Sequence, residues 1–201
     1  MSEKPKAKRQ LGALEITHRV LRKHIQPGDL CIDATAGRGF DTALLCELTG
    51  QTGTVLAFDI QPDAIASTKA LLDTKGYHAQ LHLDSHANMR QYAADGTVSA
   101  VVFNFGWLPR GSHEIFTHAD SSIAALNAAL ALLMVGGLLS LCIYYGGANG
   151  YTERDALLEY IASLDSRYYT VVQCQFPNRT GDPPFAVLIT KDAQPPQEVE
   201  S

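Results

Sequence analysis

The stretch LCIDATAGRGFDTALLCELTGQTGTVLAFD, residues 30–59, decides the expected fold. It opens with a short apolar run, and Gly37 and Gly39 then bracket a tight turn. Apolar residues at helical spacing follow over 40–48, and a second apolar run ends at Asp59. Strand, glycine turn, helix and strand in this order form half of a nucleotide-binding site.

Two details of this half-site favour a cationic ligand over a phosphate. Thr42 stands where a dinucleotide fingerprint has its third glycine, and Asp41 lies at the start of the expected helix. The helix dipole favours an acid there by about 0.3–1 kcal/mol, but that acid repels phosphate. S-adenosylmethionine (SAM) has a ribose and an adenine, no phosphate, and two cationic centres. We therefore expect SAM, with Asp33 and Asp41 facing its cationic end and Asp59 binding the ribose.

Two alternatives for this stretch stay open. One is NAD or another nucleotide, and the other is a glycine turn in a protein that binds no cofactor. Residues 30–59 alone do not decide between these alternatives and SAM, so the choice depends on motifs in the rest of the chain.

Length and composition fit one globular domain. The chain has 201 residues, of which 46% are hydrophobic and 18% charged. It contains no apolar run long enough for a membrane span and no apolar secretory segment near its start. We expect a single domain over 11–191, between a disordered basic arm at 1–10 and a disordered acidic tail at 192–201.

Cysteine usage and net charge bear on compartment and partners. The four cysteines are far apart in apolar segments without a CxxC pair, which predicts buried thiols in a cytoplasmic protein and no zinc site. The net charge of −5 does not favour nucleic-acid binding. Residues 1–24 nevertheless carry seven Lys and Arg against two Glu, and such an arm can contact a phosphate backbone or simply be a solvated end.

Strands and helices alternate along the remaining chain. Further strands are expected at 79–83, 98–103, 138–145, 168–176 and 185–190, and further helices at 11–25, 62–75, 87–92, 120–134 and 152–164, the last with Thr152 as its N-cap. No helix separates the last two strands, so they should pair antiparallel. The pattern predicts an α/β fold: a Rossmann-like, doubly wound, mostly parallel seven-stranded sheet with a closing antiparallel hairpin.

Ligands of such a sheet bind at the carboxyl ends of its strands. The polar residues expected at that edge are Asp33, Gly37, Gly39, Asp41, Asp59, Gln61, Ser85, His86 and Asn104. His78, His82 and His86 are spaced by four, but they flank a strand and no acid cluster accompanies them, so we expect no metal site.

FNFGWLP at 103–109 is the segment that bears on the acceptor. It has the layout of the Asn-Pro-Pro-aromatic loop of amino-group methyltransferases. Asn104 is suited to accept a hydrogen bond from a substrate amine and aim its lone pair at the methyl group of SAM. Trp107 is suited to stack on a flat substrate, which is worth about 1–3 kcal/mol per base. The alternative is a strand-end turn with a core tryptophan.

Several motifs in order carry a family resemblance. They are DATAGRGFDT (33–42), AFDIQPDAI (57–65), DSHANM (84–89), FNFGWLP (103–109), SIAALNAALALLMVGGLLSLCIYYGG (122–147) and NRTGDPPFAVLI (178–189). Together they resemble the small class I methyltransferases known as rRNA methylases, over about residues 11–190. Members of that family are implicated in methylating 5-aminomethyl-2-thiouridine at the tRNA wobble position.

The resemblance implies tRNA as a partner, a substrate-facing Asn104 loop, and SAM contacts at Gly37, Gly39, Asp41, Asp59, Gln61, Ser85 and His86. Three positions depart from the family pattern: Arg38 and Phe40 stand where Asn and His are usual, and Trp107 where Tyr is common. Our leading hypothesis is an N-methyltransferase for that aminomethyl group. The alternatives are a methyltransferase for rRNA or a small-molecule amine, a non-catalytic SAM-binding module, and an NAD oxidoreductase.

Overall fold

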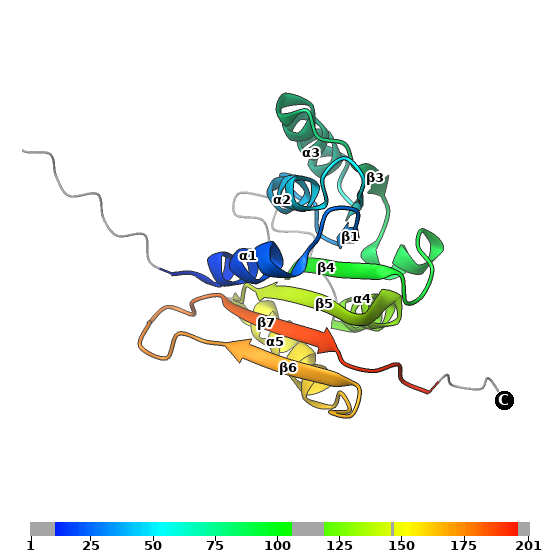
Figure 1. Ribbon diagram of the computed structural model, residues 1–201. Coiled ribbons are helices and arrows are strands. Elements are labelled where there is room, and N and C mark those ends of the chain that lie inside the picture. Colours follow the sequence, from blue (N-terminus) through cyan, green and yellow to red (C-terminus); the bar gives the residue numbers. More distant parts are fainter. Residues whose placement is uncertain (1–10, 106–118, 146, 197–201) are drawn as a thin grey trace, which may run out of the picture.

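The computed structural model describes residues 11–105, 119–145 and 147–196, so the predicted Trp107 lies outside the described residues. Seven strands form one sheet with helices on both faces (Figure 1). In chain order the elements are α1 (Ala13–His24), β1 (Leu30–Asp33), α2 (Phe40–Thr49), β2 (Thr54–Asp59), α3 (Pro62–Lys75), β3 (Gln80–Leu83), the 3₁₀ helix η1 (His86–Gln91), β4 (Val98–Phe105), α4 (Ala119–Leu132), β5 (Leu133–Ile143), α5 (Gly147–Ala162), β6 (Tyr169–Cys174) and β7 (Phe185–Lys191).

The strand order is β3-β2-β1-β4-β5-β7-β6. β1 to β5 run parallel, and β7 is antiparallel to both of its neighbours. The predicted doubly wound sheet with a closing hairpin is therefore confirmed. The chain leaves β1 toward one edge and returns on its other side with β4, so the carboxyl ends of β1 and β4 mark the switch point where ligands bind.

The register brings polar residues to that edge. Asp33 is aligned with Ala57 of β2 and with Val102 of β4. Asp59 and Asn104 therefore each lie two residues beyond the row that contains Asp33. Because successive residues of a strand alternate between faces, two residues further places both on the same face as Asp33.

Three expected boundaries are wrong, each because packing overrides a local signal. β4 continues to Phe105, and Asn104 of β4 is paired with Cys142 of β5. Asn104 therefore lies within a strand and not in a loop. β5 begins at Leu133, directly after α4, and a bulge between the pairs Val98–Leu133 and Ala100–Leu138 absorbs the two glycines that we expected to end the helix.

Helix α5 begins at Gly147, so Thr152 lies inside the helix and is not its N-cap. The early start brings Gly150 against the backbone of Tyr145, where a Cβ would lie 3.4 Å from the Tyr145 Cα.

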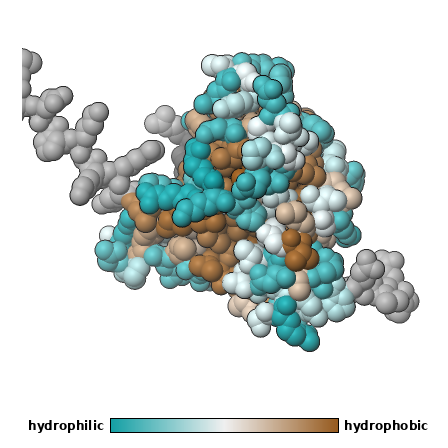
Figure 2. Space-filling view, in the orientation of Figure 1, coloured by the Kyte–Doolittle hydropathy of each residue, from teal (hydrophilic) through white to brown (hydrophobic). Residues whose placement is uncertain are grey.

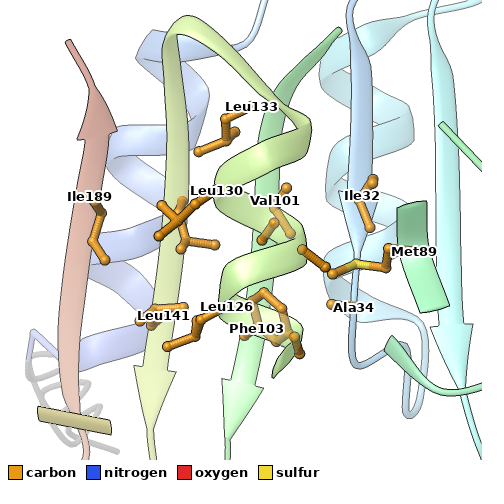
Figure 3. Close-up of a cluster of buried hydrophobic side chains, with 14 of the residues drawn as sticks. Ile32, Ala34, Met89, Val101, Phe103, Leu126, Leu130, Leu133, Leu141 and Ile189 are labelled. Carbon is orange, nitrogen blue, oxygen red and sulfur yellow. The ribbon is translucent and has the colours of Figure 1, made fainter. Parts of the chain in front are cut away.

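Two layers of apolar side chains fill the space on either side of the sheet. One layer packs η1, α4 and α5 on the central strands, and Figure 3 shows its members Ile32, Met89, Val101, Leu126 and Leu141. The other layer packs α1, α2 and α3 on the opposite face, with Leu21, Leu45 and Leu72 fully or almost fully buried. Burial on both faces accounts for the continuous apolar runs of β1, β2 and β4.

Helix α1 covers the front of the sheet beside β5 and β7. Its buried side comprises Ala13, Thr17 and Leu21, while Arg22, Lys23 and His24 occupy its last turn. Figure 2 shows a hydrophilic band along α1 and a hydrophobic area next to it. Among the described residues, none of the helices combines the length and apolar character that crossing a bilayer requires.

Lys191 is a buried cation at the end of β7, only 1% exposed. Its Nζ donates hydrogen bonds to the carbonyl oxygens of Leu130 in the last turn of α4 (3.1 Å) and of Leu133 at the start of β5 (2.8 Å). Burial lowers the pKa of the ammonium group. The side chain thus satisfies carbonyl oxygens at the junction of α4 and β5, where helical hydrogen bonding ends.

We expect Lys191→Met to lower the free energy of unfolding by about 1–3 kcal/mol, because it leaves buried carbonyl oxygens without this donor. Lys69→Met is the matched control, since Lys69 is exposed and paired only with Asp73 on the same helix, and it should change stability by less than about 0.5 kcal/mol. Urea unfolding of both variants measures the difference. Equal stability of the two variants would contradict this role of Lys191.

Candidate active site

The glycine turn between β1 and α2 is pressed against α3. Gly39 has φ +80° and its N–H donates to the Ala36 carbonyl at 2.7 Å. A Cβ at Gly39 would lie 2.8 Å from the Cα of Thr68, and the Thr68 hydroxyl donates to the Gly37 carbonyl at 3.2 Å. Both the backbone conformation and the close approach of α3 therefore require glycine at position 39.

Asp33 lies beneath this turn and is fully buried. Its carboxylate accepts hydrogen bonds from the Thr42 hydroxyl at 2.6 Å and from the Thr35 N–H at 3.1 Å. Burial, followed by the charge of Asp41, raises the pKa of Asp33. Asp33 therefore supports the turn from below, and its contact with the cationic end of SAM stays a prediction. Thr42, in place of a third glycine, supplies the partner that this buried acid needs.

Asp59 ends β2 beside the glycine turn. One carboxylate oxygen accepts the N–H of Gly37 and the other accepts the N–H of Gln61, both at 2.9 Å. Each oxygen keeps a second lone pair, and the side chain is only half-buried. The two oxygens are thus held at fixed positions and can still accept the hydroxyls of a ribose. Gln61 is half-buried at the N-cap of α3.

Ser85 and His86 form the corner between β3 and η1. The Ser85 hydroxyl accepts the Ala87 N–H at 3.3 Å and so caps η1. His86 Nδ1 lies 3.2 Å from the Ala34 carbonyl, which can only accept, so Nδ1 carries the proton. Burial lowers the pKa of His86, and its ring lies edge-on to Phe103. The neutral ring therefore ties this corner to the end of β1.

Asp41 connects the glycine turn to α1 and β4. One of its carboxylate oxygens lies 2.6 Å from Nε2 of His18, and the other accepts a hydrogen bond from Nδ2 of Asn104, also at 2.6 Å. The Asn104 N–H donates to the Thr35 hydroxyl at 2.8 Å. A carboxylate accepts and cannot donate, so Asn104 turns its NH₂ toward Asp41 and leaves its carbonyl oxygen available.

The charges of this edge suit a cation. Asp33, Asp41 and Asp59 lie around the glycine turn, and within the described ranges none of them pairs with a lysine or an arginine. The part of the chain that the structure describes contains no group of three His, Cys, Asp or Glu arranged to hold a metal ion. Three acids without a lysine or arginine partner, one of them with lone pairs free for hydroxyl groups, fit SAM, which has a ribose, a sulfonium and an ammonium.

The structure brings together all predicted site residues that it describes, and it adds three more. Thr35 and Thr42 fix the turn, and their proximity to Asp33 in sequence was a usable signal. His18 had no such signal, because it lies on a different helix, 23 residues before Asp41. Its position on an amphipathic helix is typical of an ordinary surface histidine.

Comparison with protein families places residues 55–190 in a family described as Putative rRNA methylase. A curated relative from Arabidopsis thaliana, named tRNA (mnm(5)s(2)U34)-methyltransferase, chloroplastic, is 34% identical over 191 residues. The match covers 90% of this chain and 70% of the relative.

Two solved structures share both sequence and fold with this chain. A protein from Clostridium thermocellum, described as a putative rRNA-methylase, is 38% identical with a TM-score of 0.88, covering 92% of this chain and all of that one. A protein from Streptococcus mutans, described as a putative methyltransferase and solved in complex with S-adenosylhomocysteine (SAH), is 32% identical with a TM-score of 0.82. The match covers 91% of this chain and 99% of that one.

We expect Gly39→Ala to lower the free energy of unfolding by about 2–4 kcal/mol and to weaken SAM binding, because it adds overlap with α3 to the cost of a left-handed backbone. Gly76→Ala is the control: Gly76 has φ +68° but open space around its Cβ position, so it should cost only about 1–2 kcal/mol. Urea unfolding and calorimetric titration with SAH measure both effects. Equal losses in the two variants would contradict the close-approach explanation.

Proposed function

This chain belongs to the Putative rRNA methylase family and is a SAM-dependent methyltransferase, and we propose that it methylates the aminomethyl nitrogen of 5-aminomethyl-2-thiouridine at the tRNA wobble position. The orientation of the Asn104 amide supports an amine acceptor most directly, since its carbonyl oxygen is left to accept an N–H. The name of the Arabidopsis relative supports a tRNA wobble uridine as the acceptor.

The cofactor side of the proposal uses the residues around the glycine turn. Gly37 and Gly39 let the backbone approach SAM, and Asp59 holds the ribose with oxygens fixed by two backbone N–H groups. Gln61, Ser85 and His86 would hold the adenine at the same edge of the sheet. Bound there, SAM supplies the methyl group on its sulfonium and leaves as SAH.

The acceptor side of the proposal depends on Asn104. Its carbonyl oxygen accepts one N–H of the neutral aminomethyl group and thereby directs the nitrogen lone pair toward the methyl group. The contribution is positional, because holding two reactants in line replaces a bimolecular encounter. Trp107 stays a proposed stacking partner for the uracil ring. A small-molecule amine is the second candidate acceptor, favoured by the net charge of −5.

We expect Asn104→Ala to lower kcat at least about 100-fold, because the amine loses its orienting acceptor, while SAH affinity stays within about twofold. Asp59→Ala is the converse variant: it should weaken SAH binding on the order of 10-fold or more through the loss of a bidentate acceptor. Methyl transfer from labelled SAM and calorimetric titration separate the two effects. An unchanged kcat in Asn104→Ala would overturn the proposed mechanism.

The substrate is tested by nucleoside mass spectrometry of total tRNA from cells that lack this protein. We expect 5-aminomethyl-2-thiouridine to accumulate and its N-methylated form to disappear, with restoration by a plasmid copy of the gene. The Asn104→Ala gene serves as the control that should not restore the methylated nucleoside. An unchanged nucleoside profile in the deletion would remove this substrate and favour another amine.

A further inference from the structure

We propose that His18 is a positioning residue for methyl transfer, acting through Asp41 to hold the carbonyl oxygen of Asn104 toward the acceptor amine. The inference rests on the proposed function, because it requires an acceptor that donates an N–H to Asn104. It assigns a role in catalysis to α1, a helix that lies outside the nucleotide half-site.

The geometry is a chain of two short hydrogen bonds through one carboxylate. His18 Nε2 and Asn104 Nδ2 each lie 2.6 Å from a different oxygen of Asp41. The Asp41 side chain is 8% exposed and that of His18 is 27% exposed. Water therefore has little access to Asp41, and the protein has to supply the donors that its carboxylate needs.

Which group of the Asn104 amide faces the acceptor depends on whether Asp41 is ionised or protonated. An ionised carboxylate requires a donor, so the amide presents NH₂ to Asp41 and its carbonyl oxygen to the acceptor. A carboxyl group protonated on the oxygen next to Asn104 would itself donate, and the amide would then present its NH₂ to the acceptor. An NH₂ group facing an amine N–H cannot accept its hydrogen bond, so that arrangement does not support transfer.

Acidic and uncharged side chains lie near Asp41. Asp33 lies close enough in β1 that the charge of Asp41 contributes to its raised pKa. The side chains of Cys142 and Tyr144, at the end of β5, also face Asp41 and carry no positive charge. Within the described ranges, His18 is the titratable donor that contacts Asp41. Its hydrogen bond satisfies Oδ1 of Asp41, the carboxylate oxygen that Asn104 does not contact.

Helix α1 is anchored well enough to hold His18 in place. Leu21 is fully buried in the layer that α1 shares with α2, and the Thr17 side chain is buried with its hydroxyl bonded to the Leu14 carbonyl at 2.8 Å. Arg22 forms an ion pair with Glu47 of α2 at 2.7 Å. These contacts thus fix the position of α1 and, with it, of the His18 imidazole next to Asp41.

Three variants test the proposal with the full-length protein, labelled SAM and tRNA from cells that lack the protein. His18→Ala should lower kcat on the order of 10- to 100-fold, the range expected when a reacting group is misplaced, with SAH affinity within about twofold. His18→Gln places an amide N–H near the position of Nε2 and should recover most of the rate. Thr17→Val removes a buried hydroxyl from the same helix without touching Asp41, and its kcat should stay close to that of the wild type.

Each other result overturns the proposal. An unchanged kcat in His18→Ala would show that Asp41 positions Asn104 without a hydrogen bond from His18. A His18→Gln variant as slow as His18→Ala would point to proton transfer by the imidazole, and an equal loss in Thr17→Val would point to general loosening of α1.

A readout without turnover separates this inference from the proposed function. The side-chain amide of Asn104 can be assigned in ¹⁵N-labelled protein as the NH₂ signal missing from Asn104→Ala. We expect it to shift in His18→Ala and to keep its wild-type position in His18→Gln and Thr17→Val. If wild-type protein does not methylate the wobble uridine, the proposed substrate fails, whereas an Asn104 signal that His18→Ala leaves unmoved overturns the inference itself.

Discussion

The carboxylate of Asp41 joins three elements that lie far apart in sequence. Asp41 lies in the first turn of α2, and its two carboxylate oxygens contact His18 of α1 and Asn104 of β4, each at 2.6 Å. Because the carboxylate is almost inaccessible to water, it is satisfied only when all three elements are docked. The geometry of the acceptor side therefore depends on the packing of α1 and of the central strands, and not on the glycine turn alone.

Asp33 and Asp59, two of the acids around the turn, differ in burial and in their hydrogen bonds. Asp33 is buried and satisfied internally by Thr35 and Thr42, and burial raises its pKa. Asp59 is half-buried and keeps lone pairs for a ligand. Among the described residues this concentration of acids has no lysine or arginine as a partner, and its one basic contact is His18 on Asp41. It costs folding stability, and it leaves a field that attracts the cationic end of SAM.

The departures from the family pattern leave the turn itself intact. Arg38 and Phe40 flank Gly39, and both side chains are exposed, Phe40 by 65%. The turn is held by glycine conformations and by Thr68, neither of which involves these two side chains. A change at positions 38 and 40 can therefore alter what the turn presents to a ligand without altering how it folds.

The sequence by itself determined the order of elements, the half-site and the edge of the sheet where the site lies, because apolar periodicity, glycine turns and strand-end acids are local signals. Only the tertiary structure decided that Asn104 lies within β4, that Asp33 is buried against Thr42, and that His18 contacts Asp41. Those outcomes depend on strand register and on how α1 docks across β5 and β7. Hydrogen bonds between residues 23 and 63 positions apart are set by packing, which no local pattern encodes.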